Sequence, residues 1–384
     1  MSEDFIYLDH AAATPVDRKV QAAMEPYLSD DFFNPSSPYA PAVRVRREYE
    51  AAKASIGRSI GSGGDDIIIT AGATESINLA FRGVGGHIVT TAIEHHAVLE
   101  TAKIFEHTLV PVSEKGLVSA EEIKNAIRPD TRIVSVALAN NEIGSIQPLR
   151  SISEIVKEER LRRSEAGEDT PIYLHSDASQ GVGQVDIHVA RLGVDMLTMN
   201  AAKAYGPKQV GLLWTGSHVR LNEVVSGGGQ ERGLRSGTEN VAGTVGFAKA
   251  LEMAVEHRDY ESRRLLKLRD DMQKKLLDAF PGAIVSGHQK SRLAGHLHIS
   301  FPGVDAERVL FMLESKGVYV ATGSACAANK GTRSHVLTAI GLEPGVADGS
   351  IRMTFGKLSS EENCARAVEL ITEAVTKEKL RVGI

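Results

Sequence analysis

Cysteine is scarce in this chain, since the 384 residues contain only Cys326 and Cys364. Two thiols are too few for a disulfide framework or for a zinc site built from cysteines. Cys364 lies in an amphipathic helical pattern, which is typical of an inert, packed thiol. Cys326 lies among small residues without a core-like apolar pattern, so it is the candidate for an exposed, mobile nucleophile.

Long apolar runs are also missing. No run approaches the ~18 residues of a membrane-spanning helix, and the first residues lack the basic and apolar regions of a signal peptide. We therefore expect a cytoplasmic protein that does not contact a membrane.

The chain has no excess of basic charge, because its formal net charge is −5. Its densest basic runs, 44–47 and 160–163, are interleaved with glutamates in helix-like segments, which favours solvated helix faces over a nucleic-acid surface. The histidine pair His95 and His96 lacks a third ligand at a convincing spacing, so we expect no metal site.

Short β-rich runs alternate with helical segments from about residue 66, which predicts an α/β fold with a mainly parallel sheet. A chain of this length favours two domains. We expect a large domain over residues 15–255 and a smaller α/β domain made of 1–14 and 256–384, with one long helix over about 239–280 between them. Strands are predicted at 67–70, 87–91, 108–112, 132–138, 172–175, 196–199, 211–214, 296–301, 318–321 and 350–355.

Polar residues follow several of these strands. In open α/β sheets ligands gather at the carboxyl ends of the strands, so we expect one crevice lined by Thr74, His95, Asn141, Asp177 and Lys203. Lys203 is the leading candidate, because it follows an apolar strand among Ala201, Ala202 and Ala204, and desolvation lowers an amine's pKa until it can form a Schiff base. On its own, an ordinary solvated lysine is the commoner case.

Each of the neighbouring motifs can be interpreted as a structural feature or as part of a binding or catalytic site. The segment 72–76 follows a strand and opens a helix, so it could be a simple cap or a phosphate cup. Asp177 could cap a helix or pair with a protonated pyridine nitrogen, and His95 could stack on a ring or move protons. Arg352, on a late strand, could grip a carboxylate with two hydrogen bonds.

Taken together, these stretches resemble the group I cysteine desulfurases, a branch of the class V aminotransferase family with pyridoxal-phosphate fold type I. The resemblance runs nearly end to end. Each motif is weak alone, but their joint order is specific: 7–15 (YLDHAAATP), 34–37 (NPSS), 72–75 (GATE), 94–95 (EH), 140–144 (NNEIG), 177–180 (DASQ), 205–208 (YGPK), 235–238 (RSGT) and 323–326 (GSAC).

The resemblance implies a fold, a cofactor and roles for particular residues. It implies conversion of L-cysteine to L-alanine, with the sulfur passed to Cys326 as a persulfide and then to an acceptor protein of iron–sulfur cluster assembly or thiolation. Lys203 would bond to pyridoxal 5′-phosphate, Asp177 would hold its ring nitrogen, and His95 would stack on the ring. The remaining implied contacts are Asn141 and Gln180 near the phenolic oxygen, Ala73 and Thr74 at the phosphate, Thr238 reaching the phosphate from the other subunit of a homodimer, and Asn34, Asn141 and Arg352 at the substrate carboxylate.

Two departures from the family pattern stand out. Where the family usually has serine three residues before the lysine and histidine directly before it, this chain has Asn200 and Ala202. Both family residues bond the cofactor phosphate; Asn200 can still donate, whereas Ala202 cannot. The chain also ends at 380–384 without the aromatic tail that many relatives use to dock a scaffold protein, so the sulfur acceptor stays open.

Three alternatives remain at this stage. The chain could prefer selenocysteine, could be another fold type I lyase or aminotransferase, or could be a degenerate relative that only binds partners in cluster assembly. The presence of Cys326 argues against a plain aminotransferase. A non-catalytic relative has no use for the full set of Lys203, Asp177, Cys326 and Arg352, so their joint presence argues against the degenerate alternative.

Overall fold

The computed structural model describes residues 5–322 and 333–384. Its largest sheet has seven strands in the order β2-β8-β7-β6-β5-β3-β4. β8 runs antiparallel to both of its neighbours, β2 and β7, and the other neighbouring pairs are parallel. The mainly parallel sheet predicted from the sequence is confirmed. The strands are β2 (Ile67–Thr70), β3 (His87–Thr91), β4 (His107–Val110), β5 (Thr131–Ser135), β6 (Tyr173–Asp177), β7 (Met196–Asn200) and β8 (Gly211–Thr215).

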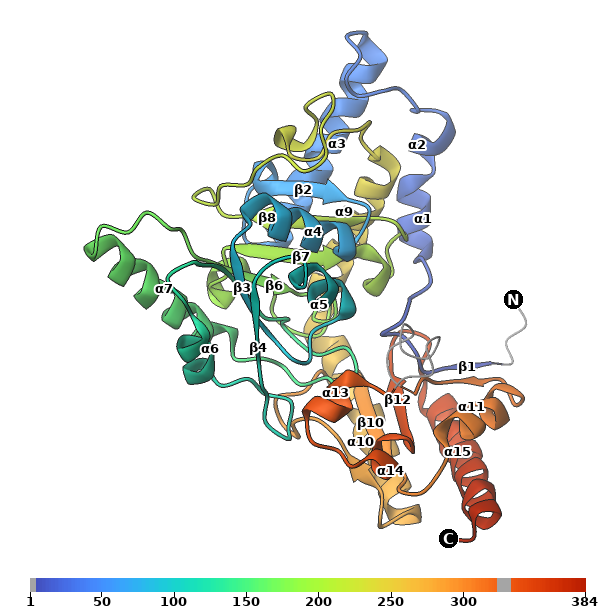
Figure 1. The fold of residues 1–384 in the computed structure, drawn as a ribbon. Helices are drawn as coiled ribbons and strands as arrows, with labels where there is room; N and C mark the ends of the chain where they lie inside the picture. Colours follow the sequence, from blue (N-terminus) through green and yellow to red (C-terminus); the bar gives the residue numbers. More distant parts are fainter. Residues whose placement is uncertain (1–4, 323–332) are drawn as a thin grey trace.

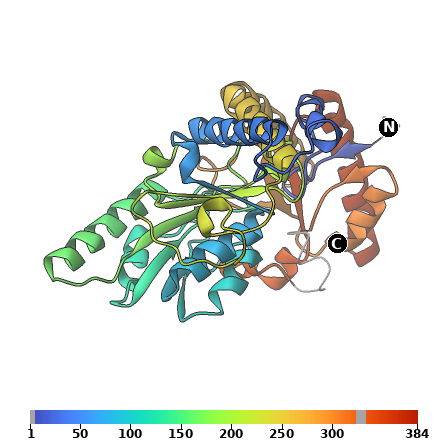
Figure 2. The ribbon, with the colours of Figure 1, turned by 90° about the horizontal axis from the view of Figure 1, so that it is seen from above.

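Helices cover both faces of this sheet (Figures 1 and 2). Successive side chains on a strand point to opposite faces, so Ile67 and Ile69 join one apolar core while Ile68 joins another. The first core also holds residues of α3 (Ala40–Ile60), α7 (Leu149–Glu165) and α9 (Val241–Glu256). The second core holds residues of α4 (Ala73–Val84) and α5 (His96–Ala102). Burial on both faces explains why these strands are apolar runs rather than alternating patterns.

A third apolar core lies against a smaller antiparallel sheet, in which β10 (His296–Ser300) pairs with β12 (Ser350–Thr354) and β9 (Ile284–Val285). Helices α10 (Arg258–Ala279), α11 (Ala306–Glu314) and α15 (Glu361–Val382) pack against it. The N-terminal strand β1 (Ile6–Tyr7) pairs with β11 (Val318–Tyr319), so the first strand joins this C-terminal part of the chain (Figure 1). The domain boundaries at 14/15 and 255/256 stay a prediction.

The remaining elements are short. They are α1 (Arg18–Met24), α2 (Pro26–Ser29), α6 (Ala120–Ala126), α8 (Val189–Leu192), α13 (His335–Ala339), α14 (Pro344–Ala347) and the 3-10 turns Gly64–Asp66, Ala201–Lys203 and Glu231–Gly233. Within the two described ranges, every helix is too short or too polar to cross a membrane.

The long helix predicted over 239–280 is wrong. The structure has α9 and α10 instead, separated at His257, whose φ of −97° and ψ of 2° leave the helical region. The break has a packing cause. Phe247 and Leu251 of α9 belong to the core of the large sheet, whereas Leu268 and Met272 of α10 belong to the core of the small sheet.

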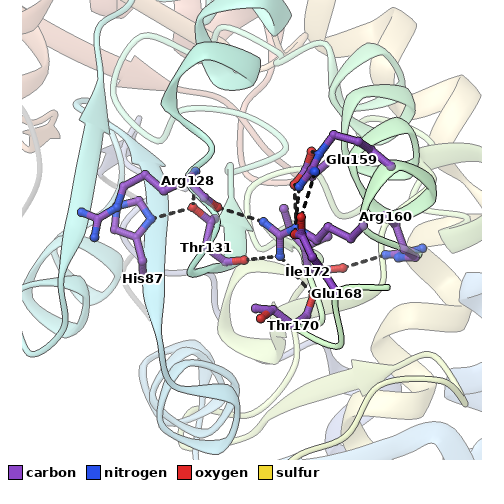
Figure 3. A network of polar contacts seen from close by, with 10 residues as sticks. His87, Arg128, Thr131, Glu159, Arg160, Glu168, Thr170 and Ile172 are labelled. Carbon is purple, nitrogen blue, oxygen red and sulfur yellow. Dashed lines mark hydrogen bonds and ion pairs between the residues drawn. The ribbon is translucent and has the colours of Figure 1, made fainter. Parts of the chain in front are cut away.

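The solvated face predicted for 160–163 is wrong at Arg163, which is only 2% exposed. Its guanidinium pairs with Glu159 and donates to the carbonyl oxygens of Thr131, Thr170 and Arg128. Figure 3 shows this network, with these four partners labelled. A buried guanidinium needs its donors satisfied, and these carbonyls satisfy them. Arg163 therefore fixes the C-terminal half of α7 to the start of β5.

Candidate active site

A cavity of about 280 Å³ lies at the carboxyl ends of the parallel strands. Residues far apart in sequence line it, and two of them, Ala11 and Ala12, come from the N-terminal segment. Most of the predicted site residues meet here: Ala73, Thr74, His95, Asn141, Asp177, Gln180, Asn200, Lys203 and Arg352.

Lys203 ends the 3-10 turn that follows β7, and its side chain is half-buried. Its Nζ donates to the carbonyl oxygens of Ala11 (2.7 Å) and Ala12 (2.5 Å). The backbone behind it is fixed as well, since the Ala202 carbonyl accepts from Thr14 N (3.1 Å) and from Thr14 Oγ1 (2.9 Å). The amine is thus held by backbone oxygens at the cavity wall.

Asp177 is the last residue of β6, next to β7 in the sheet. Its Oδ1 accepts from the backbone N–H of Ser179 (2.9 Å) in a turn, and no helix starts there. The helix-cap alternative is therefore wrong. Because only one carboxylate oxygen is used in the turn, the other can accept a hydrogen bond from a group in the cavity.

His95 caps α5, with Nδ1 accepting from the backbone N–H of Ala97 (3.1 Å). Burial lowers the pKa of His95; the charge of Asp177 opposes this shift and that of Lys203 adds to it. The ring is therefore neutral at pH 7, and since Nδ1 accepts, the proton lies on Nε2. His95 can donate a hydrogen bond into the cavity.

The carboxylate of Glu94, the neighbour of His95, is engaged in hydrogen bonds within the protein. Its carboxylate accepts from Thr91 Oγ1 (2.9 Å) and from the backbone N–H of Ala137 (3.0 Å), and burial raises its pKa to about 7. Among residues 5–322 and 333–384, no group of three His, Cys, Asp or Glu side chains is arranged to hold a metal ion.

The N-terminus of α4 opens on the cavity without a side-chain cap. Its first backbone N–H groups and the helix dipole therefore suit an anion such as a phosphate. Asn200 stands beside it: a Cβ built on Gly72 would lie 3.9 Å from Asn200 Nδ2. Since Asn200 Oδ1 accepts from the Ala202 N–H (3.0 Å), the amide orientation leaves Nδ2 as a donor. Gly72 adopts a φ of +137°, which is open to glycine and strained for other residues.

Arg352 is 2% exposed on β12. Its Nη2 pairs with Asp9 Oδ1 (2.6 Å), and its Nη1 donates to the Asn141 carbonyl (3.2 Å). Its Nε has no partner in the part of the chain that the structure describes. A buried guanidinium with a donor to spare is suited to a carboxylate.

Two predicted residues lie elsewhere, and a third is outside the described residues. Asn34 and Thr238 are exposed and do not line the cavity, and Asn34 Oδ1 accepts from the Ser36 N–H (2.9 Å) in a local turn. Cys326 lies outside the described residues. The other cysteine, Cys364, is 2% exposed, and burial raises the pKa of its thiol to about 11, in agreement with its predicted packing role.

The loop that carries Thr238 is anchored to the body of the large sheet. Glu231 accepts from the Tyr49 hydroxyl, from the Ile69 N–H (2.6 Å) and from Lys53 Nζ (3.3 Å). Arg235 pairs with Glu75 of α4 (2.7 Å). These contacts fix the loop near the open end of α4 without bringing Thr238 into the cavity of its own chain.

Sequence reasoning missed the carbonyl groups of Ala11 and Ala12, which hold Lys203, and the side chain of Asp9, which pairs with Arg352. A backbone carbonyl carries no side-chain signal. Asp9 lies within a motif quoted for the family resemblance, but nothing in its neighbours indicates an arginine partner 343 residues away.

Comparison with known proteins places this geometry in a family. The family model "Aminotransferase class-V" matches residues 6–366. The chain is 39% identical to "Cysteine desulfurase IscS" of Methanosarcina thermophila, covering 97% of this chain and 92% of the relative. It is 40% identical to the protein of the same name from Dictyoglomus turgidum, covering 98% and 95%.

Solved structures agree. A "NIFS-LIKE PROTEIN" superposes with a TM-score of 0.88 at 33% identity, covering 97% of this chain and 100% of the other. A structure named "SspA in complex with cysteine" superposes with a TM-score of 0.77 at 31% identity, covering 91% and 98%.

Proposed function

The chain belongs to the class-V aminotransferase family, and on this premise we propose that it is a pyridoxal-phosphate-dependent cysteine desulfurase. One observation carries the proposal. Asp177 ends β6, and Lys203 follows the adjacent strand β7. Both side chains share one cavity with His95, Arg352 and the uncapped N-terminus of α4. This arrangement offers an amine, a carboxylate, an imidazole, a guanidinium and an anion site around one small space.

The residues present fit pyridoxal 5′-phosphate. The first N–H groups of α4, with Thr74 and Asn200, would hold the phosphate. Asp177 would hold the ring nitrogen, Lys203 would bond to the aldehyde, and His95 would lie against the ring. Gln180 and Asn141 would bond near the phenolic oxygen. When bound, the cofactor supplies an electron sink for the α-carbon of an amino acid.

The protein's own groups supply orientation and proton movement. Arg352, with Asn141, would hold the substrate carboxylate, and its pair with Asp9 keeps the guanidinium in place. Lys203 Nζ, held at the cavity wall by two carbonyl oxygens, would take up the α-proton. His95, neutral with its proton on Nε2, would donate to an oxygen that gains charge.

Cys326 would take the sulfur. Its thiolate attacks the sulfur of cysteine, the bond between that sulfur and the β-carbon breaks with its electron pair left on the organic part, and protonation there yields alanine. The persulfide on Cys326 would pass its outer sulfur to an acceptor protein of iron–sulfur cluster assembly or thiolation. In a homodimer, Thr238 of each subunit would reach the phosphate site of the other, which agrees with its absence from the cavity of its own chain.

The test uses the two cysteines as a matched pair. The purified enzyme should absorb in the visible, and cysteine with a thiol reductant should yield alanine and sulfide in equal amounts. Cys326→Ala should retain the absorption and lose sulfide release, because the nucleophile is gone. Cys364→Ala should retain both, because that thiol is buried and its pKa is raised. Full sulfide release by Cys326→Ala would refute the proposal.

A further inference from the structure

A second cavity lies behind the active site. Its volume is about 210 Å³, and it shares Ala11, Gln180 and Lys203 with the active-site cavity. These three residues form a hydrogen-bonded partition, because the Ala11 carbonyl accepts from Lys203 Nζ (2.7 Å) and from Gln180 Nε2 (3.2 Å). We call the space beyond this partition the rear cavity.

The rear cavity is apolar along most of its wall and open at one end. Val182, Ala254, Leu265 and Phe355 contribute apolar surface. The lining residues His257, Tyr260 and Lys357 are exposed, so a molecule can enter from solvent.

Two charged side chains on the wall are paired. Lys357 Nζ lies 2.6 Å from Asp17 Oδ2, and Glu261 lies 2.7 Å from the Arg264 guanidinium. Lys19 also lines the cavity, but it is exposed, so water screens its charge. Charged groups that have partners or lie in water give little attraction to an ion, so the cavity favours a neutral occupant.

Among the residues that the structure describes, three buried polar atoms of the wall lack a partner: His10 Nε2 and the two ring nitrogens of His296. His10 is 6% exposed and its Nδ1 lies 2.9 Å from the Thr354 carbonyl oxygen, so Nδ1 carries the proton and donates. Burial lowers the pKa of His10, which keeps the ring neutral. Its Nε2 is then an acceptor, and it has no hydrogen-bond partner among the described residues. A buried acceptor without a partner costs free energy that a donor on a ligand would recover.

We propose that the rear cavity is a binding site for a compact, neutral, single-ring molecule whose hydroxyl or N–H group donates to His10 Nε2. The size supports a single ring, because a dry cavity of about 150 Å³ is enough for benzene and this one is moderately larger. An occupant would lie against the partition that holds Lys203, so the site is placed to influence the catalytic lysine. Binding at this site does not depend on the proposed reaction taking place.

The probe is phenol, with anisole as the same ring without a donor. Binding of each to the purified enzyme is measured by ligand-detected NMR titration. Phenol should saturate one site per chain and bind at least about fivefold more tightly than anisole. The cavity-filling variant Ala254→Leu should weaken phenol at least about tenfold, whereas Ala365→Leu, the same change at an exposed position of α15, should not.

A further variant addresses the acceptor itself. His10→Asn keeps a side-chain N–H that can reach the Thr354 carbonyl but removes Nε2, so phenol should lose its advantage over anisole. Non-saturable binding, equal binding of phenol and anisole to the unchanged enzyme, or full phenol binding by Ala254→Leu would overturn the proposal. These measurements do not use desulfurase activity, so a failure of this proposal and a failure of the proposed function can be distinguished.

Discussion

Replacing Ala202 with histidine should slow the loss of cofactor during turnover. In this chain, Asn200 Nδ2 is a side-chain donor beside the open end of α4, whereas the neighbouring Ala202 offers no donor. The backbone at this position is fixed, because the Ala202 carbonyl accepts from both the N–H and the hydroxyl of Thr14. The substitution therefore changes the side chain on a backbone that is already held in place.

The size of the effect follows from one hydrogen bond to a charged group, which contributes about 1.5 to 3 kcal/mol. At about 1.4 kcal/mol per factor of ten, the variant should hold the cofactor roughly 10- to 100-fold more tightly. The difference should be visible only with cysteine present, because the bond to Lys203 retains the cofactor until substrate releases it.

The assay is dialysis of the holoenzyme with and without cysteine, followed by measurement of the cofactor left per chain. Ala202→Phe is the matched control, since it adds a ring of similar size without a donor. Two results would refute the reasoning: equal loss from the unchanged enzyme and Ala202→His, or retention by Ala202→Phe as tight as by Ala202→His.

Three further predictions concern Arg352 at the site and two buried side chains elsewhere, Glu231 and His298. Arg352→Lys should raise KM for cysteine at least about tenfold with a smaller effect on kcat, because a lysine cannot make the two-pronged contact; steady-state kinetics with an unchanged KM would contradict this. Glu231→Gln should lower the free energy of unfolding by about 3 kcal/mol, because Lys53 would be left buried without its charge partner. In urea denaturation, the exposed-pair control Glu369→Gln should change little, and an equal loss in both variants would count against the argument. Burial lowers the pKa of His298 to about 3, so the unfolded chain binds a proton that the folded chain does not, and stability should fall as the pH drops from about 6.5 towards 3. His298→Gln should reduce that slope by at most about 1.4 kcal/mol per pH unit, and an unchanged slope would show that this ring is protonated in the fold.

The sequence was most informative where one physical rule decides the outcome. Parallel strands place their carboxyl ends at one edge of a sheet, so the polar residues after separate strands were expected to meet. Asp177 ends β6, and Lys203 follows β7, its parallel neighbour. The strand pattern alone was enough to place these two side chains on one cavity.

The sequence was least informative where tertiary packing overrides a local pattern. Nothing at His257 breaks a helix by its own chemistry, since it is neither glycine nor proline. The chain leaves the helix there because the segments on either side pack against different cores. Arg163 gives the same lesson: its charge predicted a solvated face, but three carbonyl oxygens near the start of β5 satisfy it inside the protein.

The N-terminal segment shows why the site needs the whole chain. Asp9 pairs with Arg352 of β12, while Ala11 accepts from Lys203 and donates its N–H to Thr354 Oγ1 (2.8 Å). Asp9 and Ala11, two positions apart in one segment, thus hold two proposed site residues. Asp9 holds Arg352, which is proposed to bind the substrate carboxylate, and Ala11 holds Lys203, which is proposed to move the α-proton. A shift of this segment by a single residue would displace both together, so the spacing from Asp9 to Ala11 sets the distance between the two groups that cysteine has to bridge.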